Sequence, residues 1–246
     1  MNIGILGIGE VGTAIRKITE KKHTVYTANK KSDLIRGNKI EVLHVCIPYN
    51  SGFVKIVTDA VKAYQPALVI IESTVAAGTT DKIAQKTAPI KALVCHSPIR
   101  GVHPNLYEGI MTFVKYIGPT SKLAGKKAQK YYKGLGLKTK VFENARTTEI
   151  AKLMDTTYYG WNIVFQKEMA KICSKNKISL EQAYTKWNDT YNRGYIKLGM
   201  PHVVRPVLKN MKGKIGGHCI ISNCEILETK LPNPISNIIL KRNKGY

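Results

Sequence analysis

Apolar runs of strand length alternate with helix-length segments along the first 142 residues. The runs that we predict to be strands lie at 1–7, 24–28, 42–48, 67–71, 92–95, 112–117 and 140–142. Helical patterns lie between them, at about 14–18, 51–64, 79–86 and 121–133. Continuous apolar strands separated by helices are typical of parallel strands buried on both faces. The pattern therefore predicts an α/β fold built on a doubly wound, mostly parallel sheet.

A different pattern begins at Thr147. Apolar residues recur at helical spacing as far as about Cys173, which predicts one helix of roughly 40 Å at a rise of about 1.5 Å per residue. Such a long helix can connect two domains or build a dimer interface. A shorter helix is predicted at 179–189, followed by a loop that carries Arg193, Arg205 and finally the segment Gly216-Gly217-His218-Cys219. We divide the chain into a sheet domain, 1–146, and a smaller helical domain, 147–246, which we expect to form a homodimer.

The composition is that of a globular protein, because 43% of the 246 residues are hydrophobic. The net charge of +23 raises the question of nucleic-acid binding. The lysines are dispersed in short pairs, however, and no helix-turn-helix, zinc-finger or aromatic RNA-binding pattern accompanies them. We therefore expect the charge to solvate the surface and to attract anionic cofactors and substrates, and we expect no nucleic acid partner.

Three further features concern the cellular setting and metals. The N-terminus has no basic leader and no apolar run is long enough to span a bilayer, so we expect a cytoplasmic protein without a membrane partner. Five widely spread cysteines form no disulfide-scaffold pattern, which indicates that they are reduced. The spacing of His218, Cys219 and Cys224 fits no standard zinc pattern, so no metal site is expected.

The first strand leads into a glycine-rich turn that opens a helical pattern. Its sequence is Gly7-Ile8-Gly9-Glu10-Val11-Gly12. In a dinucleotide-binding turn the first glycine permits the tight bend, the second admits the pyrophosphate, and the third allows the helix to pack closely on the strand. The position of this motif between a strand and a helix predicts a NAD(P)-binding site in the sheet domain.

The end of the second predicted strand bears on the choice of cofactor. A carboxylate there would bind the 2′-hydroxyl of the adenosine ribose. The chain has Asn29, Lys30 and Lys31 instead, and two cations favour the 2′-phosphate of NADP(H) over NAD(H). The alternative is that these are ordinary loop lysines of a lysine-rich protein. Ligands of such sheets bind beyond the carboxyl ends of the strands, which adds Ile47, Pro48 and Thr74 to the predicted cofactor site.

The segment 213–219 ends with two adjacent glycines, His218 and Cys219. The glycines let the backbone approach another group closely. His218 or a nearby lysine would stabilise a Cys219 thiolate, which could then act as a nucleophile. Alternatively, Cys219 is a small buried hydrophobic residue, as most intracellular cysteines are. Taken alone, the segment favours the second interpretation.

Together these motifs resemble, in kind and in order, those of the UDP-glucose/GDP-mannose dehydrogenase family. The resemblance extends over nearly the whole chain. The matching segments are the glycine-rich turn 7–12, Cys46-Ile47-Pro48, Glu72-Ser73-Thr74-Val75-Ala76-Ala77-Gly78-Thr79-Thr80, Ser97-Pro98-Ile99-Arg100, Glu149-Ile150-Ala151-Lys152 and Gly216-Gly217-His218-Cys219.

The resemblance implies a four-electron oxidation, in which the primary alcohol of a nucleotide sugar becomes a carboxylate and two nicotinamide cofactors are reduced. Cys219 matches the family's nucleophile, which forms a thiohemiacetal and then a thioester. Lys152 matches the lysine that stabilises oxyanions, and Thr74 a polar residue near the reacting centre. Thr156 stands where the family has an asparagine, four residues after the lysine.

We also expect a set of residues to hold the anionic substrate. These are Arg100, Arg193, Arg205, Gly217 and His218. In a homodimer, Arg193 or Arg205 would reach the site of the neighbouring subunit.

Departures from the family pattern concern the chemistry and the architecture. Ile99 replaces the glutamate of the S-P-E segment, which is associated with thioester hydrolysis. Thr156 replaces the asparagine of the long helix, and Asn223 replaces the acid that follows the cysteine. The chain also stops about where the family's C-terminal UDP-binding domain would start.

Four functions therefore stay open. The first is a divergent dehydrogenase that retains Cys219 and Lys152. The second is a two-electron hydroxyacid-type dehydrogenase that needs only the lysine. The third is a cofactor-binding protein without turnover. The fourth is a nucleic-acid-binding protein, which we rank last; retention of the cysteine segment places the first ahead of the second.

Overall fold

The computed structural model describes residues 1–101, 104–217 and 219–246. It divides into two compact units, Met1–Lys152 and Leu153–Tyr246. The first unit contains a seven-stranded sheet in the order β2-β1-β3-β4-β5-β6-β7. The strands are β1 (Asn2–Leu6), β2 (Thr24–Ala28), β3 (Val42–Val45), β4 (Leu68–Ile71), β5 (Leu93–His96), β6 (Lys115–Pro119) and β7 (Thr139–Val141).

The sheet is mostly parallel, and this confirms the fold class predicted from the sequence. All pairs from β2 through β5 are parallel. Only β6 runs antiparallel to its neighbour β5, and β7 is again parallel to β6. Because each of the central strands is covered on both faces, alternate residues of one strand enter different cores. In β4, for example, Ile70 belongs to one core and Val69 to the other.

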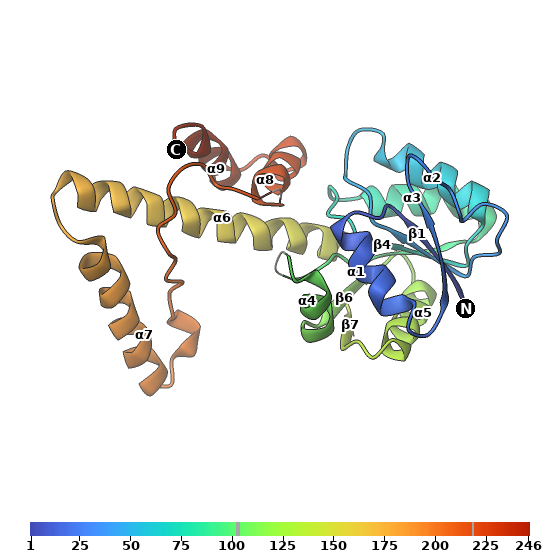
Figure 1. The fold of residues 1–246 in the computed structure, drawn as a ribbon, viewed down its shortest axis with the longest axis horizontal. Helices are drawn as coiled ribbons and strands as arrows, with labels where there is room; N and C mark the ends of the chain where they lie inside the picture. The colour runs from blue at the N-terminus through green and yellow to red at the C-terminus, as the bar shows by residue number, and fades with distance from the viewer. Residues whose placement is uncertain (102–103, 218) are drawn as a thin grey trace. The chain divides into compact units, whose positions relative to one another are not determined.

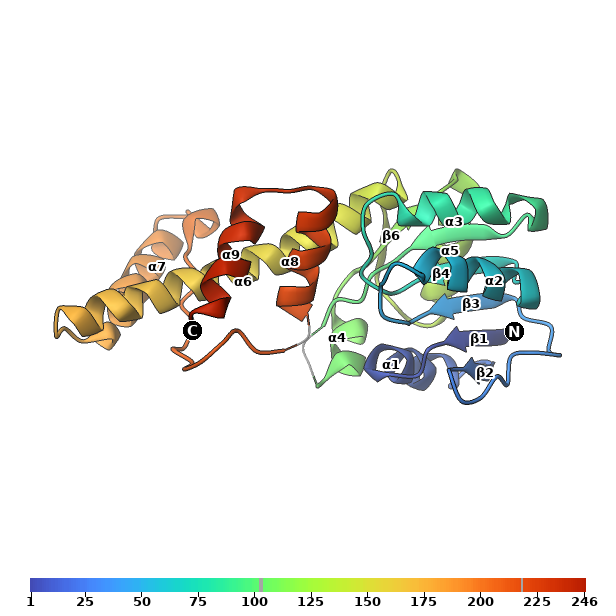
Figure 2. The ribbon, with the colours of Figure 1, turned by 90° about the horizontal axis from the view of Figure 1, so that it is seen from above.

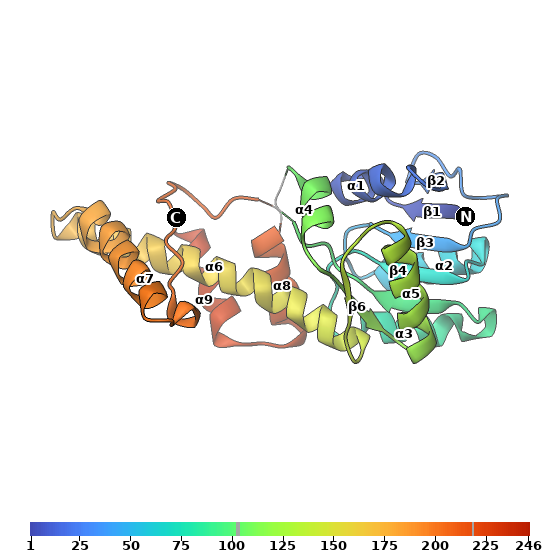
Figure 3. The ribbon, with the colours of Figure 1, turned by 90° about the horizontal axis from the view of Figure 1, so that it is seen from below.

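Helices cover the two faces of the sheet (Figure 1). One face is covered by α2 (Phe53–Tyr64) and α3 (Thr79–Thr87), which lie in front of the sheet in Figure 2. The opposite face is covered by α1 (Glu10–Thr19), α4 (Leu106–Thr112) and α5 (Lys122–Gly134), which Figure 3 shows from below. The arrangement is the doubly wound one that the alternating pattern predicts.

The parallel register brings functional segments to one edge. Leu6 pairs with Val45, Val45 with Ile71, and Ile71 with His96. The carboxyl ends of β1, β3, β4 and β5 are therefore level. The residues that follow each strand, which include the glycine-rich turn and the segment Glu72-Ser73-Thr74, lie along a single edge of the sheet.

One predicted strand boundary in this unit is wrong. The apolar run 112–117 is not one strand, because its first residue ends α4 and β6 begins only at Lys115. The sequence analysis did not predict α4. The apolar residues Phe113 and Val114 join the end of α4 to β6, and hydrophobicity alone does not mark the change from helix to strand.

The second unit is helical. It contains most of α6 (Ala145–Lys175, 31 residues), whose first turns belong to the sheet unit. A π-helical segment, η2 (Glu181–Lys186), continues directly into α7 (Trp187–Lys197), and a 3-10 turn, η3 (Pro201–Val203), follows. The chain then forms α8 (Cys219–Lys230) and α9 (Pro234–Lys244). Val164, Ile215, Cys224 and Ile239 form the core of this unit.

The helical unit corrects two further expectations. Arg193 lies in α7 and not in a loop, because the π-helical segment does not end the helix that we predicted to stop near residue 189. Cys219 is the first residue of α8, a helix that the sequence analysis did not predict. Among the described residues, no helix combines the length and the apolarity that crossing a bilayer requires.

Candidate functional site

The glycine-rich turn has the geometry of a dinucleotide cradle. Gly7 has φ +94°, and a Cβ there would lie 2.8 Å from the Cys46 carbonyl oxygen. A Cβ on Gly12 would lie only 1.9 Å from the Gly7 carbonyl oxygen, so the first turn of α1 packs directly on the bend. No atom lies within 4 Å of the corresponding position at Gly9. The N-terminus of α1, which begins at Glu10, is thus open to an anion.

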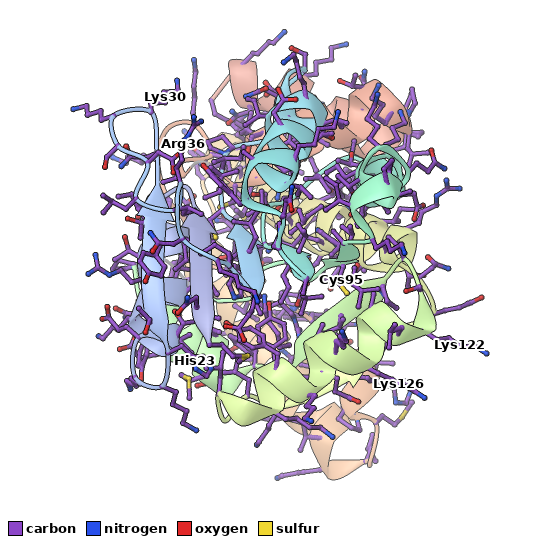
Figure 4. All side chains as sticks on the ribbon, turned by 90° about the vertical axis from the view of Figure 1, so that its right-hand side faces the viewer. His23, Lys30, Arg36, Cys95, Lys122 and Lys126 are labelled. Carbon is purple, nitrogen blue, oxygen red and sulfur yellow. The ribbon has the colours of Figure 1, made fainter. Side chains whose placement is uncertain are left out.

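The loop after β2 carries the predicted ribose-binding residues. The Asn29 side chain accepts hydrogen bonds from the backbone N–H groups of Lys31 and Ser32, at 2.7 and 3.0 Å. Lys30 and Lys31 are exposed, and Figure 4 shows Lys30 extending outward from this loop. The asparagine therefore shapes the loop, and both lysine side chains remain in solvent.

Sequence reasoning missed an acid in the same loop. Asp33 forms an isolated bridge with Ala28, the last residue of β2. Burial raises the pKa of Asp33, but hydrogen bonds from Tyr64 and from the backbone of Arg36 outweigh it and lower the pKa. The Arg36 guanidinium also lies 3.4 Å from this carboxylate. Asp33 is thus already engaged, and its distance of five residues from the strand end explains why the strand-end rule did not reveal it.

At the carboxyl end of β4, Glu72 is fully buried and bound on every side. His44 Nδ1 lies 2.8 Å from its carboxylate, Tyr132 donates to it at 2.6 Å, and Lys115 forms an ion pair with it. Burial would raise the pKa of Glu72, but the Lys115 charge and the hydrogen bonds lower it to about 2. Glu72 therefore stays charged and belongs to the frame of the sheet. The sequence pattern identified Glu72 but gave no sign of Lys115 or His44.

The two residues after Glu72 form the edge of the site. The Ser73 hydroxyl donates to the carbonyl of Ile47 at 2.6 Å, which ties the end of β4 to the end of β3. Thr74 is half-buried beside it. Thr74, Ile47 and Pro48 therefore lie on the edge that also carries the glycine-rich turn.

In the segment after β5, Ile99 stands where the S-P-E segment of the resembled family has a glutamate. Ile99 is buried and belongs to the same core as Ile70 and Ile117. Arg100 lies over the rings of Phe113 and Tyr116, at 5.5 and 4.8 Å from their centroids. Its guanidinium therefore rests on aromatic faces at the rim of the sheet.

In the helical unit, Cys219 lies half-buried at the start of α8. Asn223 lies one turn further and donates to the Thr156 hydroxyl of α6 at 3.1 Å. The two residues that depart from the family pattern on α6 and α8 are thus bonded to each other. Gly217 is exposed with φ +80°, and His218 lies outside the described residues.

Three of the other cysteines are poor nucleophiles. Burial raises the pKa of Cys95 to about 12 and the pKa of Cys224, and burial together with the Glu72 charge raises that of Cys46. A thiol whose pKa is raised carries little thiolate at neutral pH.

Known proteins share both sequence and fold with this chain, although no family model matches it. The UDP-N-acetyl-D-mannosamine dehydrogenase of Methanocaldococcus jannaschii is 27% identical in an alignment of 224 positions that covers 83% of this chain and 49% of the relative. The structure of UDP-D-ManNAc dehydrogenase from Pyrococcus horikoshii aligns at a TM-score of 0.79 and 21% identity, over 99% of this chain and 68% of that one. The structure of a 3-hydroxyisobutyrate dehydrogenase of Mycobacterium tuberculosis aligns at a TM-score of 0.72 and 15% identity, over 99% of this chain and 92% of that one.

This chain is a homologue of the nucleotide-sugar dehydrogenases. It spans about half the length of the Methanocaldococcus relative. The homology confirms the family resemblance that the motifs carry, and it implies a cofactor of the NAD(P) type.

The two predicted substrate arginines of this dehydrogenase homologue have different surroundings. Arg205 lies over the rings of Tyr191 and Tyr195 of α7, at 5.0 and 5.3 Å from their centroids, and its backbone N–H donates to the Asn192 side chain. Arg193 is exposed on α7. The aromatic residues of α7 thus fix Arg205, and Arg193 extends into solvent.

Proposed function

We propose that this chain is a NAD(P)-dependent dehydrogenase that oxidises the primary alcohol of an anionic substrate, a nucleotide sugar, to a carboxylate. The observation that carries the proposal is the presence of two features in one homologous chain. One is the cradle of Gly7, Gly9 and Gly12 at the start of α1. The other is a half-buried cysteine at the start of α8. A cradle alone would suit any NAD(P) enzyme, whereas the cysteine suits oxidation beyond the aldehyde.

A nicotinamide cofactor held by the cradle would accept one hydride, so the two oxidations would use two cofactor molecules in turn. After the first oxidation, the Cys219 sulfur attacks the carbonyl carbon of the aldehyde, and the oxygen gains a proton to give a thiohemiacetal. The second oxidation removes the carbon-bound hydrogen and the hydroxyl proton and leaves a thioester. Water then cleaves the carbon–sulfur bond and releases the carboxylate and the thiol.

The other predicted residues act on charge and position. The Lys152 ammonium stabilises the negative charge that develops on the substrate oxygen, and the Thr74 hydroxyl binds near the same atom. Thr156 lies one helical turn after Lys152 and keeps Asn223, and with it the first turn of α8, in place. Arg100, Arg193, Arg205, Gly217 and His218 bind the anionic part of the substrate.

The exposed lysines after β2 support a preference for NADP(H), because they add positive charge and the neighbouring Asp33 is already bonded. Exposed aromatic side chains of α6 and α7, which include Trp161, Phe165 and Trp187, support a homodimer. Buried thiols such as Cys95 and Cys173, which form no disulfide, support a cytoplasmic location.

One observation favours a second candidate, a two-electron hydroxyacid-type dehydrogenase that uses Lys152 alone. Ile99 is part of the hydrophobic core at the position where the family has a carboxylate for thioester hydrolysis. Without that carboxylate, a thioester on Cys219 would not be hydrolysed, so turnover would need a reaction that forms no thioester.

The deciding experiment measures how much NAD(P)H forms per substrate consumed, with UDP-N-acetyl-D-mannosamine as the first probe and a panel of hydroxyacids as the second. We expect a ratio of two with the nucleotide sugar. Cys219→Ser should stop after one hydride or trap an adduct, whereas Cys95→Ala, the matched cysteine control in the sheet core, should keep the ratio. A ratio of one with a hydroxyacid and full activity of Cys219→Ser would establish the second candidate.

The same proposal requires the cofactor to bind without substrate. Calorimetric titration with NADPH and NADH should show binding at micromolar or tighter affinity for one of them. If neither binds, both dehydrogenase functions are excluded and an interaction role without turnover is the correct one.

A further inference from the structure

The start of α6 is fastened to the rest of the sheet unit by three separate contacts. They involve Glu149 and Thr148 of α6, His96 at the end of β5 and Gly118 of β6. Lys152, to which the proposed function assigns a catalytic role, lies on the next turn of the same helix. The contacts are all within the sheet unit, so they fix this turn relative to the edge that carries Thr74.

Glu149 supplies the strongest of these contacts. It is fully buried, and its carboxylate accepts three hydrogen bonds, from the N–H of Gly78 at 2.6 Å, the N–H of Thr80 at 2.8 Å and the Thr80 hydroxyl at 2.6 Å. Gly78 is the N-cap residue of α3, which has no side-chain cap of its own. The carboxylate from α6 therefore caps α3 and binds its positive end.

His96 connects the same turn to the catalytic edge. Its Nε2 lies 3.1 Å from the Ser73 carbonyl oxygen, which can only accept, so this nitrogen carries the proton. Its Nδ1 lies 2.8 Å from the Thr148 hydroxyl. Burial is the main cause that lowers the pKa of His96, to about 3, and the nearby charges of Lys115 and then Lys152 contribute. The neutral His96 ring thus links Ser73, which precedes Thr74, to Thr148, which precedes Glu149.

Gly118 permits the close approach. It pairs with His96 across β5 and β6. A Cβ at Gly118 would lie 2.1 Å from the Thr148 hydroxyl oxygen and 2.7 Å from the Asn144 carbonyl oxygen. Any side chain there would push the start of α6 away from the sheet.

We propose that Glu149, His96 and Gly118 are positioning residues that hold Lys152 in register with Thr74 for the proposed oxidation. Glu149 fixes α6 to the segment that follows Thr74, and His96 fixes it to the residue that precedes Thr74. Lys152 is three residues beyond Glu149, about 4.5 Å along a rigid helix. The contacts of Glu149, His96 and Gly118, which we call the clamp, therefore set the position of the Lys152 ammonium group. A displacement of about 1 Å in a catalytic group can cost about 100-fold in rate.

The test is a double-mutant cycle on kcat that combines Glu149→Ala with Lys152→Ala. We expect Glu149→Ala to lower kcat by at least about tenfold, with a dissociation constant for NADPH within about threefold of the wild-type value. If Glu149 acts through Lys152, the double variant should be no slower than Lys152→Ala alone. Glu143→Ala, which removes an exposed carboxylate just before α6, is the matched control and should leave kcat unchanged.

The inference is overturned if Glu149→Ala keeps kcat within twofold of wild type while Lys152→Ala is impaired, or if the two losses multiply. Should Glu149→Ala fail to fold, Glu149→Gln replaces it; the amide oxygen keeps one acceptor position, so an intermediate loss of kcat is expected, and wild-type kcat would contradict the proposal.

A second readout does not depend on the proposed function. The rate at which acetic anhydride modifies Lys152, followed by peptide mass spectrometry, should change at least about threefold in Glu149→Ala and stay constant in Glu143→Ala. An unchanged rate in both variants would overturn the clamp. If the rate changes but Lys152→Ala has no effect on turnover, the clamp is established and the catalytic role of Lys152 is the part that fails.

Discussion

At the scale of single residues, charge and exposure around the end of β2 are the basis of the proposed preference for NADP(H). Lys30 and Lys31 are exposed at the end of β2, and the hydrogen bonds of Asn29 hold the loop that carries them. Asp33 is the one acid near the strand end, and its carboxylate is bonded to the backbone of Arg36 and to Tyr64. A 2′-phosphate would therefore meet two exposed lysines, together with a carboxylate that hydrogen bonds hold within the loop.

We expect Lys30→Ala combined with Lys31→Ala to weaken NADPH binding by about tenfold or more, and to change NADH binding by less than about threefold, because only NADPH carries the 2′-phosphate. Calorimetric titration measures both. The matched control replaces Lys126 and Lys127 of α5, which keeps the loss of net charge equal; Figure 4 shows Lys126 on a different part of this unit from Lys30. Equal losses for the two cofactors would contradict the preference.

Two residues that depart from the family pattern gain a common explanation at this scale. Thr156 is shorter than asparagine, and Asn223 lacks the charge of an acid, yet the Asn223 amide donates to the Thr156 hydroxyl. Each replacement was read separately from the sequence. In the structure they form one contact between α6 and α8, so the second replacement is suited to the first.

At the scale of elements, buried polar contacts tie strands and helices together. The ion pair of Lys115 in β6 with Glu72 at the end of β4 reaches across β5, and the Lys115 ammonium also donates to the Ser97 carbonyl. His44 and Tyr132 complete the network around the carboxylate. The antiparallel strand β6 is thus anchored to the parallel part of the sheet by charge as well as by its ladder.

Lys115→Met should lower the free energy of unfolding by roughly 3–5 kcal/mol at neutral pH, because it leaves the buried Glu72 charge without its cation. Chemical denaturation measures the loss. Lys122→Met, at the exposed start of α5, is the matched control and should cost less than about 0.5 kcal/mol. A loss as small as that of the control would show that the pair contributes little.

The loss of unfolding free energy caused by Lys115→Met should depend on pH, because it depends on the charge of Glu72. The folded protein holds this pKa at about 2, below its ordinary value near 4.5, so the pair stabilises the fold above about pH 4.5. That stabilisation is lost as the pH falls through about 2. The difference in unfolding free energy between wild type and Lys115→Met should therefore shrink as the pH is lowered from 5 to 2.

At the scale of the whole molecule, the helical unit exposes aromatic side chains that a single chain leaves uncovered. A groove of about 610 Å³ runs between α6 and the segments that follow it. Its lining includes Tyr158, Trp161, Phe165, Ile172, Tyr184 and Arg205. Large apolar patches of this kind mark interaction surfaces, and homodimer interfaces are the most apolar class.

Phe165→Glu should therefore convert the proposed homodimer to monomers, or raise its dissociation constant by at least about 100-fold, because a carboxylate would be buried in the interface. Analytical ultracentrifugation measures the change. Leu123→Glu introduces the same charge at a comparably exposed apolar residue of α5 and should leave the assembly intact. A wild-type protein that is monomeric at micromolar concentration would contradict the interface.

The sequence by itself determined the features whose signals are local. Alternating apolar runs were sufficient to predict the parallel sheet, because each buried strand must be apolar on both faces. The glycine spacing was sufficient to predict the turn before α1, because the bend of Gly7 and the contact of Gly12 each exclude a side chain. The helical period identified α6 for the same reason, since one face of a long helix repeats within the sequence itself.

Only the tertiary structure decided which distant residues meet. Nothing in the order of residues connects Glu149 with Gly78 and Thr80, or Lys115 with Glu72, because these partners are between 43 and 71 positions apart and no periodicity relates them. The sequence also did not reveal α4, because apolar residues on both sides of its end, Met111 and Phe113, conceal the change from helix to strand. Burial, hydrogen-bond geometry and close approach are properties of the folded chain. They show that Glu149 and Glu72 are buried and bonded to other parts of the sheet unit, so both have structural roles. Cys219 and Lys152 stay candidates for the chemistry.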